Sequence, residues 1–289
     1  MNMITCEACR ANKVFLVTTK APTKRYFGRC FKCGLLQNID KKLPSQIEGE
    51  DFEGYLEAQD ETFEKIRRTS VLLRIRQILF QNEMELSVYD IGTGAGKFLM
   101  EASEMGFTVS GSELSFTAAA IVENNYGFRI DTGDYENLGF KNCQNSVTMF
   151  CVLAHSVNPE SLLKSINQSL KKGGVLYFHT PRFCLIDFIA ILINFISFGK
   201  LNQLLIRRIG GDHKRIYSKK SLTYVLRRAG FSEYTISPDI GYGLNKDRYF
   251  TAMGMPKKFS DAIAYVLNFF AKFNLLPRNV FTVYAFKAK

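Results

Sequence analysis

Apolar residues recur with two periodicities along the chain, one typical of strands and one typical of helices, and the changes between them indicate where the segments of the chain begin and end. In residues 1–40 the stretches KVFLV and RYFGRC alternate apolar and polar positions, as β-strands do. Residues 41–59 are polar and rich in turn formers, and residues 60–82 place apolar side chains at helical spacing. We therefore predict a small β-ribbon over 1–40, followed by a linker and cover helix over 41–84. The mixed Arg and Glu residues of that helix are expected to form a solvated face.

From residue 85 onward, strand-like and helix-like segments take turns. The pattern predicts strands at ELSVYDI, TVSGSEL, FRIDTGD, NSVTMFCVL and GVLYFHTP, with helices between them, and a last strand at NVFTVYAFKAK. Such alternation is typical of an α/β domain with a mostly parallel sheet and helices on both faces. We predict this domain over 85–289, with insertions near 182–212 and 256–276 that form lids.

The first insertion is apolar almost all round. Residues 185–198 are interrupted only by Asp187 and Asn194, and about fifteen residues are too few to span a bilayer, which needs ~20. The segment is therefore either a buried lid helix or an interfacial helix that brings residues 184–211 to a membrane, with Lys200, Arg207 and Arg208 facing lipid phosphates. The amphipathic stretch at 257–276 agrees with the second interpretation.

Composition and charge narrow the class of protein. The 289 residues are 46% hydrophobic and 22% charged, which is typical of a globular chain with a core. The net charge of +11 favours nucleic acid, an anionic membrane or a phosphorylated substrate without choosing among them. The N-terminal residues do not have the pattern of a secretory signal, so we expect a cytoplasmic protein, at the inner face of the membrane if the interfacial helix exists.

Four cysteines form two pairs near the N-terminus. Cys6 and Cys9 have two residues between them, as do Cys30 and Cys33, a spacing that suits a closed tetrahedral Zn²⁺ site. The alternatives are two disulfides or four free thiols. A reducing compartment disfavours the disulfides. We expect this zinc ion to be structural, because four protein ligands leave no position for a substrate.

A glycine-rich turn follows the first strand of the large domain. The dinucleotide fingerprint fails because Lys97 stands where its third glycine is required, and the P-loop fails on its spacing. The pattern Asp90-x-Gly92-x-Gly94-x-Gly96, with Glu113 ending the next strand, resembles the first motif of class I S-adenosylmethionine (SAM)-dependent methyltransferases.

The resemblance continues over residues 85–236. The segments GDYENLGF, VLAHSVNPESLLKSINQSLKKGGVLYFHTPRF and HKRIYSKKSLTYVLRRAGF look like the ubiquinone-biosynthesis-like branch of that family. The resemblance implies a Rossmann-like sheet of seven strands. It also implies that Glu113 holds the ribose hydroxyls, that Asp134 and Tyr135 flank the adenine, and that the backbone of residues 92–96 meets the methionine moiety. We also assign Cys151, near the end of the predicted fourth strand, to the cofactor site.

The acceptor side departs from the family pattern. Ala154 stands where the family usually has glutamate, while Asn145 and Ser146 replace an aspartate. Removing a proton from an acceptor hydroxyl suits a histidine near neutral pH. We assign His155 as the base, with His179 and His213 as the other candidate catalytic residues, for acceptor binding.

Three functions remain in competition at this stage. The first is O-methylation of a small molecule, a sugar or a lipid-linked glycan. The second is RNA methylation with the ribbon holding the phosphate backbone, which the absence of a dense basic stripe disfavours. The third is SAM binding without catalysis, suggested by Ala154.

Overall fold

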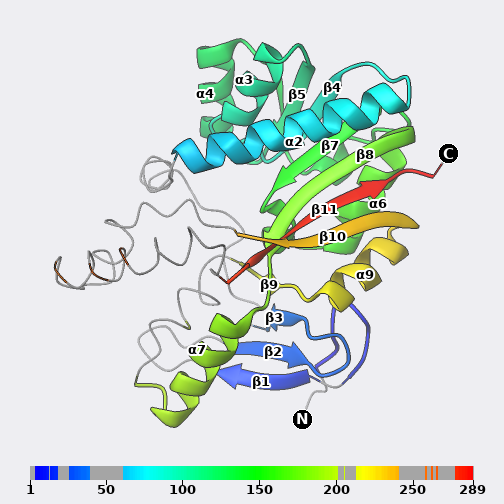
Figure 1. Cartoon of the computed structure of the whole chain (residues 1–289). Helices are drawn as coiled ribbons and strands as arrows, with labels where there is room; N and C mark the ends of the chain where they lie inside the picture. Colours follow the sequence, from blue (N-terminus) through cyan, green and yellow to red (C-terminus); the bar gives the residue numbers. More distant parts are fainter. Residues whose placement is uncertain are drawn as a thin grey trace.

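The computed structural model describes residues 4–12, 14–18, 26–39, 61–200, 213–240 and 277–288, together with the single positions 205, 258, 262 and 265. Most of the predicted linker, the end of the first insertion and, apart from those single positions, the second insertion lie outside the described residues. Figure 1 shows a large α/β unit above a small antiparallel sheet, which holds the N-terminal part of the chain.

The large sheet has seven strands in the order β10-β11-β8-β7-β4-β5-β6. The five strands from β6 to β8 in this order run parallel, and β11 is antiparallel to both β8 and β10. This arrangement confirms the predicted α/β fold with a mostly parallel seven-stranded sheet. The strands are β4 (Ser87–Ile91), β5 (Thr108–Glu113), β6 (Ile130–Thr132), β7 (Gln144–Phe150), β8 (Leu170–Pro181), β10 (Glu233–Asp239) and β11 (Val280–Phe286).

Helices cover both faces of this sheet, and each face has its own apolar core. One core joins residues of α2 (Glu61–Gln81), α3 (Lys97–Glu104) and α4 (Phe116–Tyr126) to the strands. The other joins residues of α5 (Val152–His155), α6 (Pro159–Ser169) and α9 (Lys219–Arg228) to the opposite face. The 3₁₀ turn η1 (Tyr135–Asn137) follows β6.

Side-chain caps fix where several of these helices begin. Ser115 accepts a hydrogen bond from the Ala118 amide at α4, and Asn158 accepts one from Ser161 at α6. Such caps satisfy N–H groups that have no partner inside the helix.

The expectation of a solvated polar face on α2 holds for Lys65 and Arg74, which are exposed, but is wrong for Glu64, Arg67 and Arg68. Arg68 forms a buried ion pair with Glu101 of α3, the two charged atoms being 2.8 Å apart, and Arg67 pairs with Glu64 at 3.2 Å. The cause is the position of α2, which lies across the sheet and against α3 (Figure 1), so that these side chains lie against protein.

The small sheet consists of β1 (Val14–Thr18), β2 (Tyr26–Cys30), β3 (Leu36–Asn38) and β9 (Arg215–Ile216). The first three strands form the predicted N-terminal ribbon. The fourth belongs to the large domain in sequence, and it pairs with β3 through Leu36–Ile216 and Gln37–Arg215. The ribbon also shares the core of α6 and α9, so the two parts of the chain are packed as one body.

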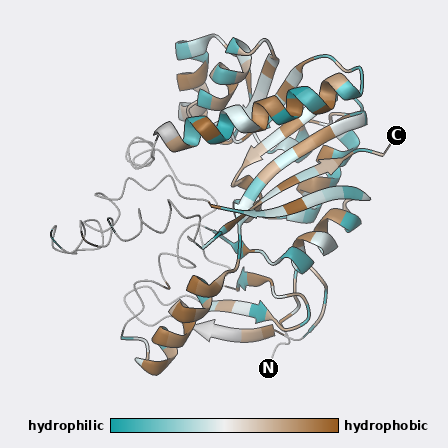
Figure 2. Ribbon diagram, in the orientation of Figure 1, coloured by the Kyte–Doolittle hydropathy of each residue, from teal (hydrophilic) through white to brown (hydrophobic). Residues whose placement is uncertain are grey.

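The first insertion contains α7 (Leu185–Ile196), which has one buried and one exposed side. Ala190 packs with Phe27 and Ile216 of the small sheet, and the buried Asp187 accepts a hydrogen bond from the Cys184 amide. The opposite side is apolar and exposed, as the brown colour of α7 in Figure 2 shows. No helix among the described residues is long and apolar enough to cross a membrane.

Candidate functional site

The glycine turn lies at the carboxyl end of β4, between this strand and α3. Gly92, Gly94 and Gly96 have φ angles of 74°, 54° and 75°, a region that favours glycine. A Cβ on Gly92 would lie 2.6 Å from the Val152 side chain, and one on Gly96 would lie 2.9 Å from Val122. Gly92 and Gly96 therefore have to be glycine, because both the backbone conformation and the neighbouring helices exclude a side chain there.

Two carboxylates flank the turn. Asp90 is buried and accepts a hydrogen bond of 2.6 Å from the Thr148 hydroxyl, while burial raises the pKa of Asp90 well above its usual range. Glu113, at the end of β5, accepts hydrogen bonds from the amides of Gly94, Leu114 and Ser115 at 2.9, 2.8 and 3.1 Å. Asp90 therefore ties β4 to β7 from inside the protein, and Glu113 is the carboxylate next to the surface of the turn.

The two residues expected at the adenine differ in their surroundings. Asp134 is exposed beside η1. Tyr135 is buried, its ring packs against Tyr89 and Phe140, and its hydroxyl donates to Ser169 at 2.6 Å. The Tyr135 side chain therefore supports the core beneath the site, and a contact with adenine stays a prediction for both residues.

Three of the predicted residues come together beyond β7. Cys151 is the residue before α5, His155 is the last residue of α5, and His213 precedes β9. The imidazole centroids of His155 and His213 are 4.7 Å apart, and the Cys151 sulfur lies 3.2 Å from Nε2 of His213. One ligating atom from each of the three residues lies within 4.8 Å of the others, so they are also close enough to share a metal ion.

The third histidine lies next to this group on β8. The carbonyl of His179 accepts a hydrogen bond from the Cys151 amide at 3.1 Å, and its ring packs edge-on against Phe150. Burial, with smaller contributions from Arg67 and His213, lowers the pKa of His179 to about 3. Burial also raises the pKa of the Cys151 thiol to about 12. Near neutral pH His179 is therefore uncharged and Cys151 is protonated.

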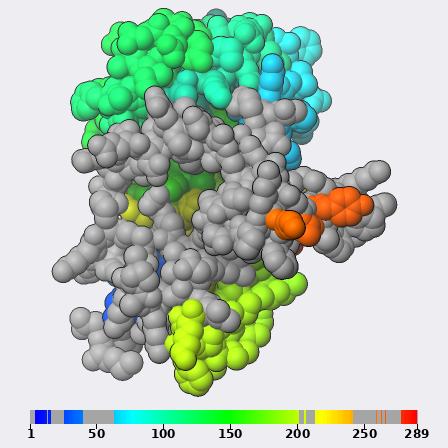
Figure 3. Space-filling view, turned by 90° about the vertical axis from the view of Figure 1, so that its left-hand side faces the viewer, coloured from blue at the N-terminus to red at the C-terminus, as the bar shows by residue number. Residues whose placement is uncertain are grey.

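The glycine turn and the histidines are neighbours in space. Val152, whose side chain limits the space at Gly92, is the first residue of α5 and is followed three positions later by His155. Cys151, just before it, has a φ of 65°, which is uncommon for a residue other than glycine and frequent at functional sites. Figure 3 shows the side of the molecule that is on the left in Figure 1. Green atoms from the middle of the chain and yellow atoms from the part after residue 213 are seen there through an opening in the surface.

The four N-terminal cysteines also converge. The sulfur of Cys6 lies 3.5 Å from that of Cys33, the sulfur of Cys9 lies 3.5 Å from that of Cys30, and all four lie within 4.8 Å of one another. These distances are too long for disulfides, whose sulfurs are ~2.05 Å apart, and they suit four thiolates around one Zn²⁺. Arg10 and Gly34, each directly after a cysteine pair, have φ angles of 60° and 76°, so both pairs end in the same tight turn.

Sequence reasoning missed two residues of this region. Thr148 bonds Asp90 across the β4–β7 pair, and Arg67 of α2 contributes to the low pKa of His179. Thr148 lies inside an ordinary strand pattern, and Arg67 lies on the helix whose charges we expected in solvent. Neither carried a motif that could have identified it.

Comparison with known protein families identifies the domain that carries this site. The family model described as a methyltransferase domain matches residues 63–235. No curated protein matches the chain.

Solved structures that are similar to this chain share little sequence with it. A phosphoethanolamine N-methyltransferase 2 of Haemonchus contortus, bound to phosphomonomethylethanolamine and S-adenosylhomocysteine, has 16% identity and a TM-score of 0.50, covering 76% of this chain and 53% of its own. A chain from the complex of the Haloferax volcanii Trm112 methyltransferase activator with a methyltransferase has 15% identity and a TM-score of 0.50, covering 80% and 97%. A SAM-dependent methyltransferase of Archaeoglobus fulgidus has 18% identity and a TM-score of 0.48, covering 76% and 94%.

Proposed function

Because this chain belongs to the methyltransferase domain family, we propose that it transfers a methyl group from SAM to an oxygen of a small-molecule, sugar or lipid-linked glycan acceptor. The observation that carries the proposal is the contact between the glycine turn and α5. The glycine turn contacts a helix that ends at His155, and the His155 ring packs against that of His213.

The residues of the turn fit the cofactor. SAM supplies a methyl group on a positively charged sulfur when it is bound. The glycines keep side chains off the backbone of the turn at three positions, so that a ligand can approach this backbone on the side away from Val152 and Val122. The Glu113 carboxylate can accept a hydrogen bond from the ribose. Asp90 stays inside the protein and holds the strand that carries the turn.

The histidine pair fits the acceptor. Methyl transfer requires that the acceptor atom, the methyl carbon and the sulfur be held in line, and orientation alone can lower the barrier by several kcal/mol. An acceptor hydroxyl must also lose its proton. We assign His155 as the base that accepts this proton, with His213 beside it. His179 is poorly suited to take this proton, because its pKa of about 3 makes it a weak base.

The acceptor class can be found by a labelled-methyl screen. The protein is incubated with methyl-labelled SAM and separated lipid, sugar-nucleotide and RNA fractions, and the labelled product is identified by mass analysis. We expect label in a sugar or lipid fraction, on oxygen. Label in RNA would support the second function considered above, and no transfer despite SAM binding would support a non-catalytic protein.

The base assignment has its own test. His155→Ala should lose about 100-fold or more in turnover, in line with the usual contribution of a general base, while its affinity for SAM stays unchanged. Full activity of this variant would remove His155 as the base. Cys143→Ala, which changes an exposed cysteine between η1 and β7, is the matched control and should keep wild-type turnover.

A further inference from the structure

The N-terminal ribbon reaches the histidine pair through the backbone. The Asn38 amide, in β3 of the ribbon, donates to the Lys214 carbonyl at 2.8 Å. The Lys214 amide in turn donates to the Ala154 carbonyl at 2.9 Å. Lys214 follows His213 directly and Ala154 precedes His155, so both histidines are next to residues that hydrogen-bond along this line.

A side-chain connection runs parallel to it. Arg215 of β9 is only 5% exposed, and its Nε donates to the carboxylate of Glu7, which lies between Cys6 and Cys9. The two remaining nitrogens of the guanidinium donate to the carbonyls of Ser156 and Val157, directly after His155. One planar cation therefore joins a turn of the four-cysteine site to the end of α5, as its fork of fixed donors allows.

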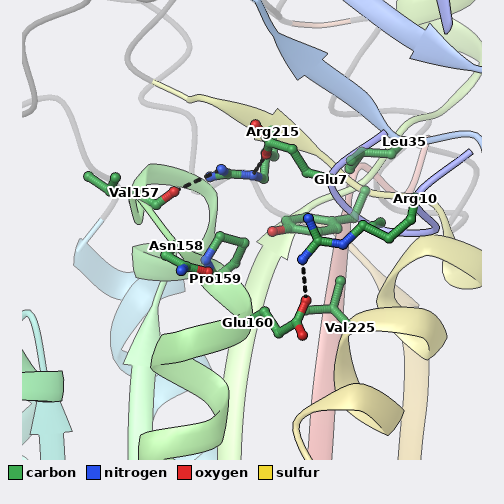
Figure 4. A pocket seen from close by; sticks show the side chains of 11 residues that line it. Glu7, Arg10, Leu35, Val157, Asn158, Pro159, Glu160, Arg215 and Val225 are labelled. Atoms are coloured by element: carbon green, nitrogen blue, oxygen red, sulfur yellow. Dashed lines mark hydrogen bonds and ion pairs between the residues drawn. The ribbon is translucent and has the colours of Figure 1, made fainter. Parts of the chain in front are cut away.

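Figure 4 shows this junction around a pocket of ≈ 310 Å³. The bond from Arg215 to Val157 crosses one side of the pocket. On the other side Arg10, from the same cysteine turn as Glu7, pairs with Glu160 of α6 at 2.9 Å. Among the residues that the structure describes, two ion pairs join the ribbon to the large domain, and the one through Arg215 leads to the histidines.

We propose that the four-cysteine site, acting through Glu7 and Arg215, positions His155 and His213 for the reaction. The importance of the pair for methyl transfer rests on the proposed function, but its placement by the ribbon does not. Glu7 and Arg215 are positioning residues, since they act through the carbonyls beside His155. The metal would fix the turn that carries Glu7, because thiolate sites of this kind are ordered only when the ion is bound.

The test uses two variants and one matched control, all in the zinc-loaded protein of 289 residues. Glu7→Ala removes the acceptor of the Arg215 bond, and its side chain is 40% exposed, so folding should survive. Arg215→Lys keeps the charge but loses the fork. Arg10→Ala removes the other ion pair between the ribbon and the large domain, at a side chain that is 62% exposed.

The readout is the imidazole NMR spectrum, which is simple because the chain contains three histidines. At constant pH we expect the signals of His155 and His213 to shift or broaden in Glu7→Ala and Arg215→Lys, and to stay in place in Arg10→Ala. Unchanged signals in both Glu7→Ala and Arg215→Lys would overturn the proposal. Equal shifts in Arg10→Ala would overturn it as well, because docking of the ribbon in general would then be the cause.

Removing the metal from the wild-type protein with a chelator should move the same two signals. If they keep their positions after the metal has left, the four-cysteine site does not position them. Once an acceptor is known, Glu7→Ala should lose turnover by about 100-fold, the size of effect that a displacement of about 1 Å produces, with an unchanged KM for SAM. A wild-type turnover would contradict the role in catalysis. The NMR result is separate from the proposed function, because it requires no methyl transfer.

Discussion

Glu113 is held in place before any ligand arrives. Its two carboxylate oxygens accept from three amides, one in the glycine turn and two at the start of the segment that leads to α4. About one of the roughly four acceptor sites of the carboxylate then remains for a ribose hydroxyl, which it can bind without a large loss of side-chain entropy.

Glu113→Ala should therefore weaken SAM binding by roughly tenfold or more, since hydrogen bonds to a charged group contribute about 1.5–3 kcal/mol each. Titration calorimetry measures this directly. Glu104→Ala, at an exposed carboxylate of α3, should bind SAM as the wild type does. Equal affinities for all three proteins would place the ribose elsewhere.

His179 makes stability depend on pH. Burial first, and then Arg67 and His213, lower its pKa to about 3, whereas a histidine in the unfolded chain has a pKa of about 6.5. Between these values the unfolded state binds a proton that the folded state does not. The contribution is complete above about pH 6.5 and is lost as the pH falls towards 3.

The variant His179→Asn should therefore show a flatter decrease in unfolding free energy between about pH 6.5 and 4 than the wild type. Urea unfolding at a series of pH values measures the difference between the two slopes. Identical slopes would mean that His179 titrates normally in the folded protein.

Among the helices, α7 exposes an apolar face that no described part of the protein covers. Its buried side packs on the small sheet, while Leu185, Phe188, Leu192 and Phe195 on the other side are 68%, 51%, 45% and 77% exposed. The spacing of these residues gives one continuous apolar face, and the chain carries a net charge of +11. We propose that this face lies on an anionic bilayer, which would suit a lipid-linked acceptor.

Replacing both Phe188 and Phe195 by serine should weaken binding to phosphatidylglycerol vesicles by roughly tenfold or more, because burial of a phenylalanine contributes about 1.5–3 kcal/mol. Co-sedimentation with vesicles measures this, and phosphatidylcholine vesicles should bind less protein. The control is Phe80→Ser, at a phenylalanine of α2 that is 82% exposed. A wild-type protein that ignores both kinds of vesicle would contradict the proposal, and the face would then cover an acceptor or a second copy.

Across the protein, the ribbon and the large domain share one core. Cys6, Cys30 and Cys33 belong to the same apolar cluster as Leu153 of α5 and Leu222 of α9. The Ser218 hydroxyl, at the start of α9, also donates to the Cys33 carbonyl. A metal at the four cysteines should therefore stabilise both parts together.

We expect Cys9→Ser to lose about one zinc ion per chain and to unfold at a lower temperature in a single transition. Metal analysis and calorimetry measure the two effects, and Cys143→Ser, at an exposed cysteine, should match the wild type. Two separate transitions would contradict the shared core. A second zinc ion that survives the change would instead place a metal at Cys151, His155 and His213.

The sequence alone was sufficient to predict those features whose pattern lies in residues close together along the chain. Alternating strand and helix patterns predicted the parallel sheet, which the strand order confirms. The spacing of Cys6, Cys9, Cys30 and Cys33 predicted the cluster that the structure contains. Both succeed because periodicity and motif spacing are set by local backbone geometry.

Only the tertiary structure decided which distant residues meet. Cys151 and His213 lie 62 positions apart and share a hydrogen bond, and Arg68 pairs with Glu101 inside the protein instead of facing water. The small sheet also gains β9, which contains Arg215 and pairs with β3 although the two strands are far apart along the chain. Such contacts depend on how the helices and strands pack against one another, and packing brings together residues whose separation along the chain carries no signal.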